Sequence, residues 1–85
     1  MTRDHLIIHL IEKDCYPDGE CDSEVAQIWI NGNNNQMCYV PYEDELALTT
    51  YCHIFYELKI DPPFEFEDDY HVYTSFRTDS LEKSK

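Results

Sequence analysis

The chain has 85 residues, of which 18 are Asp or Glu and 6 are Lys or Arg, so its formal net charge is -12 at pH 7. Such a chain has no positive field to neutralise phosphates, which argues against binding to DNA, RNA or anionic membranes and favours a protein partner with a basic surface. Its 42% hydrophobic and 14% aromatic residues predict one small folded domain, and no apolar run approaches the roughly 18 residues of a membrane span.

We expect a cytoplasmic protein in which residues 1–78 form the domain and residues 79–85 form a disordered polar tail. The first predicted element is a helix over residues 3–14, which Thr2 can cap. The apolar residues of this helix follow the spacing of one helical face, and they are Leu6, Ile7, Leu10 and Ile11.

The opposite face of this first helix carries His5 and His9, so we expect both histidines to point to solvent. The segment that follows, residues 15–24, contains a proline and a glycine among its acids. These residues stop a helix, and they predict a loop.

A β-hairpin and a second helix are predicted next. Residues 25–30 and 36–42 are rich in β-formers, and the Asn- and Gly-rich segment between them favours a turn. Apolar residues at three- and four-residue spacing then predict a helix over residues 48–59, which Thr49 or Thr50 can cap.

The C-terminal part has the alternation of a last strand. Residues 64–69 are acidic and predict an extended linker, whereas residues 70–77 alternate as a strand does, with Tyr70, Val72, Thr74 and Phe76 on one face. The predicted fold class is therefore α+β, a small α-β-β-α-β single domain whose antiparallel sheet packs against two helices.

Three segments carry a resemblance to a known family: LIIHLIEKDCY at residues 6–16, QMCYVP at 36–41 and TTYCHIFYELKI at 49–60. Together they resemble the HicA toxins, small messenger-RNA interferases on a scaffold similar to that of double-stranded-RNA-binding domains. The resemblance covers about residues 5–60. It implies an α-β-β-α scaffold with room for a further strand.

In the HicA family a histidine at the start of the first strand is catalytic. The position that matches it here is Val25, which cannot act as an acid or a base. The resemblance therefore implies the scaffold without the RNase activity, and no active-site residue is carried over.

The chain has one set of candidate metal ligands, which consists of His5, His9, Cys15 and Cys21. The two histidines are one helical turn apart, a spacing that lets two imidazoles reach one zinc ion. The first two cysteines are separated by five residues instead of the usual two to four, so surface histidines and reduced, partly exposed thiols are favoured and no cofactor is expected. Cys38 and Cys52 fall inside a predicted strand and a predicted helix, which predicts buried thiols.

Two acidic segments and several tyrosines are candidate partner-binding features. If residues 18–24 are extended, carboxylates repeat on one side at roughly 6.5–7 Å, a spacing at which a basic groove could engage several of them. Tyrosine rings near strand edges suit a protein interface. The candidate partner-binding residues are Asp18, Glu20, Asp22, Glu24, Glu65, Glu67, Asp68, Asp69, Tyr42 and Tyr73.

These features predict a non-enzymatic, acidic protein-binding module. The alternative is an acidic nucleic-acid mimic that inhibits a basic DNA- or RNA-binding protein, as anti-restriction and anti-CRISPR proteins do; the likeness to those proteins is one of size and charge. Two further questions stay open, namely whether the acids only solvate the surface and whether an unpaired strand supports a homodimer.

Overall fold

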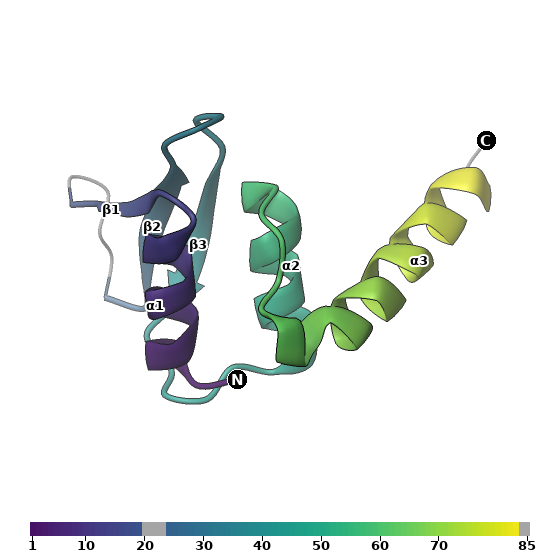
Figure 1. Ribbon diagram of the computed structural model, residues 1–85, viewed down its shortest axis with the longest axis horizontal. Coiled ribbons are helices and arrows are strands. Elements are labelled where there is room, and N and C mark those ends of the chain that lie inside the picture. The colour runs from purple at the N-terminus through teal and green to yellow at the C-terminus, as the bar shows by residue number, and fades with distance from the viewer. Residues whose placement is uncertain (20–23, 84–85) are drawn as a thin grey trace.

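The computed structural model describes the backbone of residues 1–19 and 24–83, and within these ranges the side chains up to residue 76. Three helices and a 3-10 turn accompany one antiparallel sheet with the strand order β1-β2-β3. The elements are α1 (Arg3–Glu12), β1 (Cys15–Asp18), β2 (Ala26–Asn31), β3 (Met37–Pro41), α2 (Leu48–Leu58), η1 (Phe64–Phe66) and α3 (Glu67–Lys83). In Figure 1, α1 lies in front of the sheet, α2 stands beside β3, and α3 leads away from both. The α+β class, with an antiparallel sheet packed against two helices, is confirmed.

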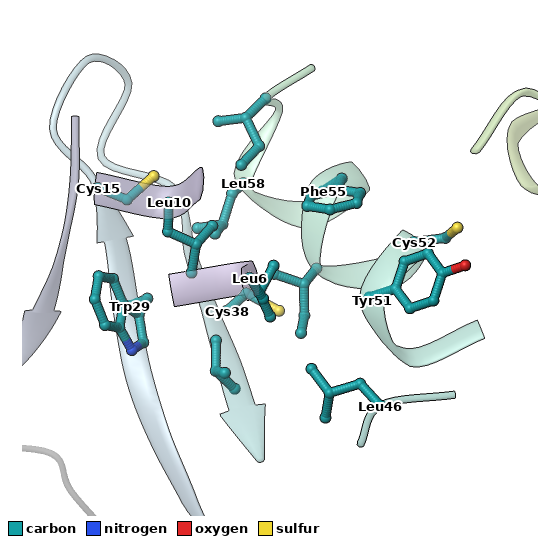
Figure 2. Close-up of a cluster of buried hydrophobic side chains, with 13 residues drawn as sticks. Leu6, Leu10, Cys15, Trp29, Cys38, Leu46, Tyr51, Cys52, Phe55 and Leu58 are labelled. Atoms are coloured by element: carbon teal, nitrogen blue, oxygen red, sulfur yellow. The ribbon is translucent and has the colours of Figure 1, made fainter. Parts of the chain in front are cut away.

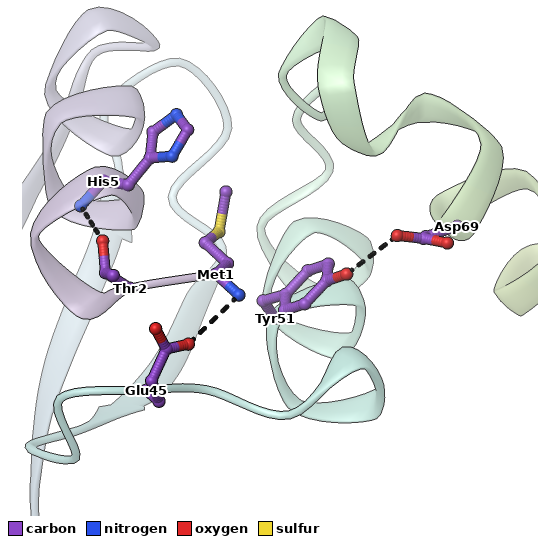
Figure 3. A network of polar contacts seen from close by, with 6 residues as sticks. All are labelled: Met1, Thr2, His5, Glu45, Tyr51 and Asp69. Atoms are coloured by element: carbon purple, nitrogen blue, oxygen red, sulfur yellow. Dashed lines mark hydrogen bonds and ion pairs between the residues drawn. The ribbon is translucent and has the colours of Figure 1, made fainter.

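Helix α1 begins as predicted, because the Thr2 hydroxyl accepts a hydrogen bond from the backbone N–H of His5 at 3.2 Å. Leu6 and Leu10 are fully buried. The chain ahead of the helix is held by an antiparallel bridge between Thr2 and Glu45 and by an ion pair of 3.5 Å between the N-terminal ammonium and the Glu45 carboxylate (Figure 3).

The predicted orientation of His9 is wrong, because its side chain is buried and only 8% exposed. The ring nitrogen Nε2 lies 2.6 Å from the backbone carbonyl oxygen of Asp61. The His9 ring packs edge-on against the Phe55 ring, with 5.6 Å between the two ring centroids. Ile11 is 59% exposed instead. The buried face is therefore rotated from the predicted one, since the hydrogen bond to Asp61 compensates the burial of the imidazole.

Residues 15–18, predicted as a loop, form the edge strand β1. The Gly32 N–H donates to the Asp14 carbonyl at 3.0 Å, and this bond fixes which residues of β1 bond to β2. Pro17, opposite Trp29, then occupies a position whose nitrogen faces away from β2. The proline removes no ladder bond, which explains how a strand can contain it.

The predicted hairpin is confirmed, with Trp29 of β2 opposite Cys38 of β3. Its turn depends on Asn31, which is 3% exposed. The Asn31 amide nitrogen donates to the Leu58 carbonyl at 2.8 Å, and its amide oxygen accepts from the Asn33 N–H at 2.9 Å. The turn therefore supplies a partner to the C-terminal end of α2, where carbonyls lack helical partners.

The predicted helix over residues 48–59 is confirmed as α2, but its predicted cap is wrong. Ala47 occupies the N-cap position and makes no side-chain cap bond, so Thr49 and Thr50 lie inside the first turn. The helix ends at Lys59, which adopts the left-handed conformation with a φ of 56°.

The core lies between the inner face of the sheet and the helices α1 and α2 (Figure 2). Its buried residues are Leu6, Leu10, Cys15, Trp29, Cys38, Val40, Leu46, Tyr51, Cys52, Ile54, Phe55, Leu58 and Ile60. The predicted burial of Cys38 and Cys52 is confirmed, since they are 9% and 0% exposed.

The predicted last strand at residues 70–77 is wrong, because this segment belongs to helix α3. Phe66, Tyr70 and Tyr73 are spaced four and three residues apart, so they fall on one helical face, and this face packs against the core. Tyr70 fits both patterns, whereas Tyr73 would face the opposite side of the predicted strand. The contact with α2 selects the helix.

The predicted extended linker at residues 64–69 is also wrong, since it forms η1 and the first turn of α3. The acids of this segment favour a helix start, because negative charge near a helix N-terminus is stabilising. Helix α3 continues to Lys83, so its backbone extends into the segment from residue 79 that we predict as a polar tail. Residues 84–85 lie outside the described chain.

Candidate protein-binding surface

The sheet has a second, outward face that is apolar and aromatic. Side chains alternate along a strand, so the inward positions of Trp29 and Cys38 in the core place their neighbours outward. We call this the outer sheet face, and its residues are Tyr16, Ile28, Ile30, Met37 and Tyr39. Tyr16 is 49% exposed, Met37 is 57% exposed and Tyr39 is 62% exposed, whereas Ile28 in the middle strand is only 9% exposed.

The strand register joins these residues into one surface. Tyr16, Ile30 and Met37 lie in one row across the three strands. Ile28 lies opposite Tyr39 in the next row, which begins with the charged Asp18 on β1. Directly opposed side chains of antiparallel strands are about 4.5–5.5 Å apart at Cβ, close enough to contact one another. In the described part of the chain no helix packs on this face, since α1 and α2 contact the inner face and α3 contacts α2.

A groove borders the outer sheet face along β3. Its volume is about 330 Å³, and it separates the outer edge of β3 from α2. The groove is lined by Tyr39, Pro41, Thr49, Thr50, His53 and Ile54. The wall from α2 is therefore largely polar, whereas the wall from β3 is formed by an exposed tyrosine and a proline.

The candidate metal ligands are held by other contacts. Within the described ranges, no group of three or more His, Cys, Asp or Glu side chains is placed to share a metal ion. Nε2 of His5 lies 3.7 Å from the Glu65 carboxylate, and the side chain of His9 is buried. Cys15 is 5% exposed, so the predicted partial exposure of this thiol is wrong; it packs inward from β1. Cys21 lies outside the described residues.

The buried thiols are poor nucleophiles. Burial and the nearby Glu57 carboxylate together raise the pKa of Cys38 to about 11. Burial and Asp69 raise the pKa of Cys52 to about 11 as well, and burial also raises the pKa of Cys15. Because the thiolate is the reactive form, these three cysteines are suited to packing rather than to covalent chemistry.

The first acidic segment is described only at its ends. Asp18 closes β1, and Glu24 is exposed just ahead of β2. Glu20 and Asp22, and with them the predicted extended spacing, lie outside the described residues.

The second acidic segment divides into exposed and anchored carboxylates. Glu65, Glu67 and Asp68 are exposed on η1 and on the first turn of α3. Asp69 is partly buried, and its Oδ2 accepts a hydrogen bond of 3.0 Å from the Tyr51 hydroxyl (Figure 3). Asp69 therefore holds α3 against α2.

The two predicted tyrosines lie away from the outer sheet face. Tyr42 is 40% exposed, and the Arg3 guanidinium lies 4.9 Å from the centre of its ring. The Tyr73 hydroxyl lies 3.1 Å from Nδ1 of His53. The Tyr73 ring packs edge-on against the Tyr56 ring, with 6.3 Å between the ring centroids. Tyr73 is thus part of the contact between α2 and α3.

Ile28, Ile30 and Met37 were not among the predicted partner-binding residues. The alternation of the hairpin strands is a signal for an outward face, and it is present in the sequence. It does not decide which face is outward, because Trp29 on one side of β2 is as apolar as Ile28 and Ile30 on the other.

A scan against models of protein families, a search of curated proteins and a search of solved structures each found no match for this chain. Among the described residues no helix has the length and apolar character needed to cross a membrane. The ligand of the outer sheet face is therefore inferred from the chemistry of the surface.

Proposed function

We propose that this chain is a non-enzymatic protein-binding module that acts in the cytoplasm and binds its partner through the outer sheet face. The observation that carries the proposal is the row of Tyr16, Ile30 and Met37, flanked by Tyr39 and Ile28, on a face without a covering helix in the described chain. Contiguous apolar patches on soluble proteins mark interaction sites, and Tyr and Met are enriched at the centres of protein interfaces.

The size of the sheet indicates what this face contributes. Three strands spaced about 4.8 Å apart and about 17 Å long present roughly 250 Å² of flat area. A standard interface buries about 800 Å² on each partner. The outer sheet face would therefore form the apolar centre of an interface, and polar residues around it would form the rim.

The scaffold supports a binding role without catalysis. The order α1-β1-β2-β3-α2 is compatible with the resemblance to HicA toxins. At the position of their catalytic histidine, Val25 presents an aliphatic side chain that is 76% exposed. The net charge of -12 disfavours RNA as the ligand and favours a protein with basic residues around its apolar contact.

The test is capture of proteins from a lysate of the source cell on the immobilised chain, compared among folded variants. Tyr16→Ser and Met37→Ser should each reduce the captured partner, because each removes an anchor of the outer sheet face. Ile11→Ser is the matched control, since Ile11 is 59% exposed but lies on α1. Equal capture by all three variants would contradict the proposal.

Salt separates this proposal from the nucleic-acid mimic. Binding centred on apolar and aromatic side chains should persist as salt rises to physiological strength. A mimic that depends on its carboxylates should lose its partner steeply over the same range, since the Debye length shrinks to about 8 Å.

A further inference from the structure

The two edges of the sheet are built differently. Strand β1 has four residues, contains Pro17 with its nitrogen facing outward, and ends at the charged Asp18. Short length, proline and charge are the features by which proteins prevent strand pairing at an edge. Strand β3 also contains a proline, but only at its last position, Pro41, whose carbonyl accepts a hydrogen bond of 3.0 Å from the Arg3 guanidinium. From Met37 to Val40 it has neither a proline nor a charged side chain. The β3 edge is therefore unprotected.

The backbone of β3 presents hydrogen-bonding groups on this edge. The Asn31 N–H donates to the Gln36 carbonyl at 2.9 Å, so alternate residues such as Cys38 face β2 and the residues between them, Met37 and Tyr39, face away. Each of these two residues carries one N–H and one C=O. Within the described ranges neither edge-facing N–H has a hydrogen-bond partner, and the Tyr39 carbonyl has only a weak contact of 3.5 Å with the Cys38 thiol.

The groove beside β3 fits an extended chain. An added strand would lie about 4.8 Å from β3, with its other side along α2, where Thr49, Thr50 and His53 line the groove. A helix beside an open strand edge is a known arrangement for taking up an extended peptide, in which backbone bonds give affinity and neighbouring pockets give specificity.

Charge favours a basic strand over a second copy of this chain. The Glu57 carboxylate lies 3.8 Å from His53 in the wall of the groove, and its field reaches Cys38 on β3. Among the described residues no Lys, Arg, Asp or Glu side chain lines the groove itself, so Glu57 beside His53 is the charge at its border. A second copy would bring another net charge of -12, whereas a lysine or arginine side chain would be attracted to Glu57 and to the negative charge of the domain.

We propose that the β3 edge takes up an extended, lysine- or arginine-containing segment of the protein partner as a fourth strand of the sheet. The segment forms backbone hydrogen bonds with Met37 and Tyr39 and lies against α2. This inference rests on the proposed function, because it specifies which part of the partner is bound beside the outer sheet face.

The probe is a synthetic peptide of about ten residues in which lysine alternates with valine or threonine, long enough to cover a strand of about 17 Å. The matched control peptide has glutamate in place of lysine. Hydrogen exchange of the intact chain, followed residue by residue by NMR, should show the Met37 and Tyr39 amides exchanging about tenfold more slowly with the lysine peptide. The glutamate peptide should protect them less.

Two variants separate backbone pairing from side-chain contact. Tyr39→Pro removes the edge-facing N–H and keeps the ladder with β2, whereas Tyr39→Thr removes the ring and keeps the N–H. Tyr39→Pro should raise the dissociation constant of the lysine peptide about tenfold more than Tyr39→Thr does. If Tyr39→Pro fails to fold, the exchange measurement on the unmodified chain decides.

The outcomes distinguish this inference from the proposed function. Strand addition would be overturned if the two Tyr39 variants reduced peptide affinity equally, or if the peptide did not slow exchange of the Met37 amide. Either result would leave capture through Tyr16 intact. Protection of the same amides that grows with chain concentration in the absence of peptide would overturn the basic strand in favour of self-pairing. Capture insensitive to Tyr16→Ser would instead defeat the proposed function.

Discussion

A hydrogen bond between a tyrosine hydroxyl and a carboxylate attaches helix α3 to the rest of the domain. Removing this hydrogen bond should lower the stability of the protein by a measurable amount. Tyr51 on α2 is 4% exposed, and its hydroxyl donates to the Asp69 carboxylate at 3.0 Å (Figure 3). Tyr51→Phe removes this hydroxyl and keeps the ring, whose centroid lies 6.1 Å from the ring centroid of Phe55 and 5.1 Å from that of Phe66. The substitution therefore isolates the hydrogen bond from the aromatic packing.

The magnitude follows from the partners of the bond. A hydrogen bond to a charged group contributes about 1.5–3 kcal/mol to stability. Asp69 is only partly buried, so water can replace the lost donor in part. We therefore expect Tyr51→Phe to lower the free energy of unfolding by about 1–2 kcal/mol.

Urea unfolding followed by circular dichroism measures this change, and a double-mutant cycle with Asp69→Asn assigns it to the pair. Asp68→Asn is the matched control, since Asp68 is an exposed carboxylate in the same helical turn. It should cost only the helix-dipole contribution of about 0.3–1 kcal/mol. A coupling energy between Tyr51 and Asp69 below about 0.3 kcal/mol, or equal losses for the two Asn variants, would refute the reasoning.

Three further predictions concern the hairpin turn and the buried thiols. Asn31→Ala should lower the free energy of unfolding by about 1–2 kcal/mol in urea titrations, because it removes the bond of 2.8 Å to the Leu58 carbonyl, which keeps only the longer bond of 3.3 Å from the Asn34 amide; a loss under about 0.5 kcal/mol would contradict this role. Gly32→Ala should lower the melting temperature by several degrees, since the new Cβ would lie 2.9 Å from a backbone carbonyl oxygen just before β1; an unchanged melting temperature would show that the turn can move. The contribution of Cys38 and Cys52 to stability should be constant below about pH 8.5 and fall as pH rises toward 11, because the unfolded thiols ionise while these two, with their pKa raised to about 11, stay protonated in the folded state. Urea titrations across this range should show a slope of up to about 1.4 kcal/mol per pH unit for each thiol, and replacement of both cysteines by alanine should reduce the slope, with a remainder from Cys15, whose pKa is raised too.

The elements that the sequence predicts well are those whose signals are local. Helix α1 and the hairpin each combine a regular apolar period with a cap or turn residue, as Thr2 and Asn31 illustrate. In α2 the apolar period alone was sufficient, since Ala47 occupies the N-cap without a side-chain bond. The local sequence of these segments is enough to predict their type, so tertiary contacts mainly decide where each one ends and which of its residues are buried.

The elements that the sequence predicts poorly depend on distant contacts. Pro17 and Gly19 are typical of a loop, and β1 becomes a strand only because β2 offers it a partner. Residues 70–77 show the alternation of a strand, but Tyr70 and Tyr73 share one face only in a helix, and both contact α2, through Phe55 and Tyr56. No local pattern carries this information.

The candidate surface could be predicted only in part for a related reason. The sequence shows that the hairpin is amphipathic in period, but β2 presents Trp29 to one side and Ile28 and Ile30 to the other. Which side faces the helices depends on the register with β3 and on the packing of Trp29 against the core. Among the described acids, Asp18 lies at the β1 end of this face, opposite Ile28, and the others named as candidates lie outside the three strands.

This distribution gives the acids a role that needs no fixed spacing. A sheet with an apolar face and an unprotected edge tends to pair with its own copies. A net charge of -12 opposes such pairing through repulsion over about 8 Å at physiological salt, and the same field attracts a basic segment. A nucleic-acid mimic would need its carboxylates at the spacing of phosphates, whereas this role requires only their number. Dispersed acids and one open edge together therefore favour a chain that binds a basic strand and avoids itself.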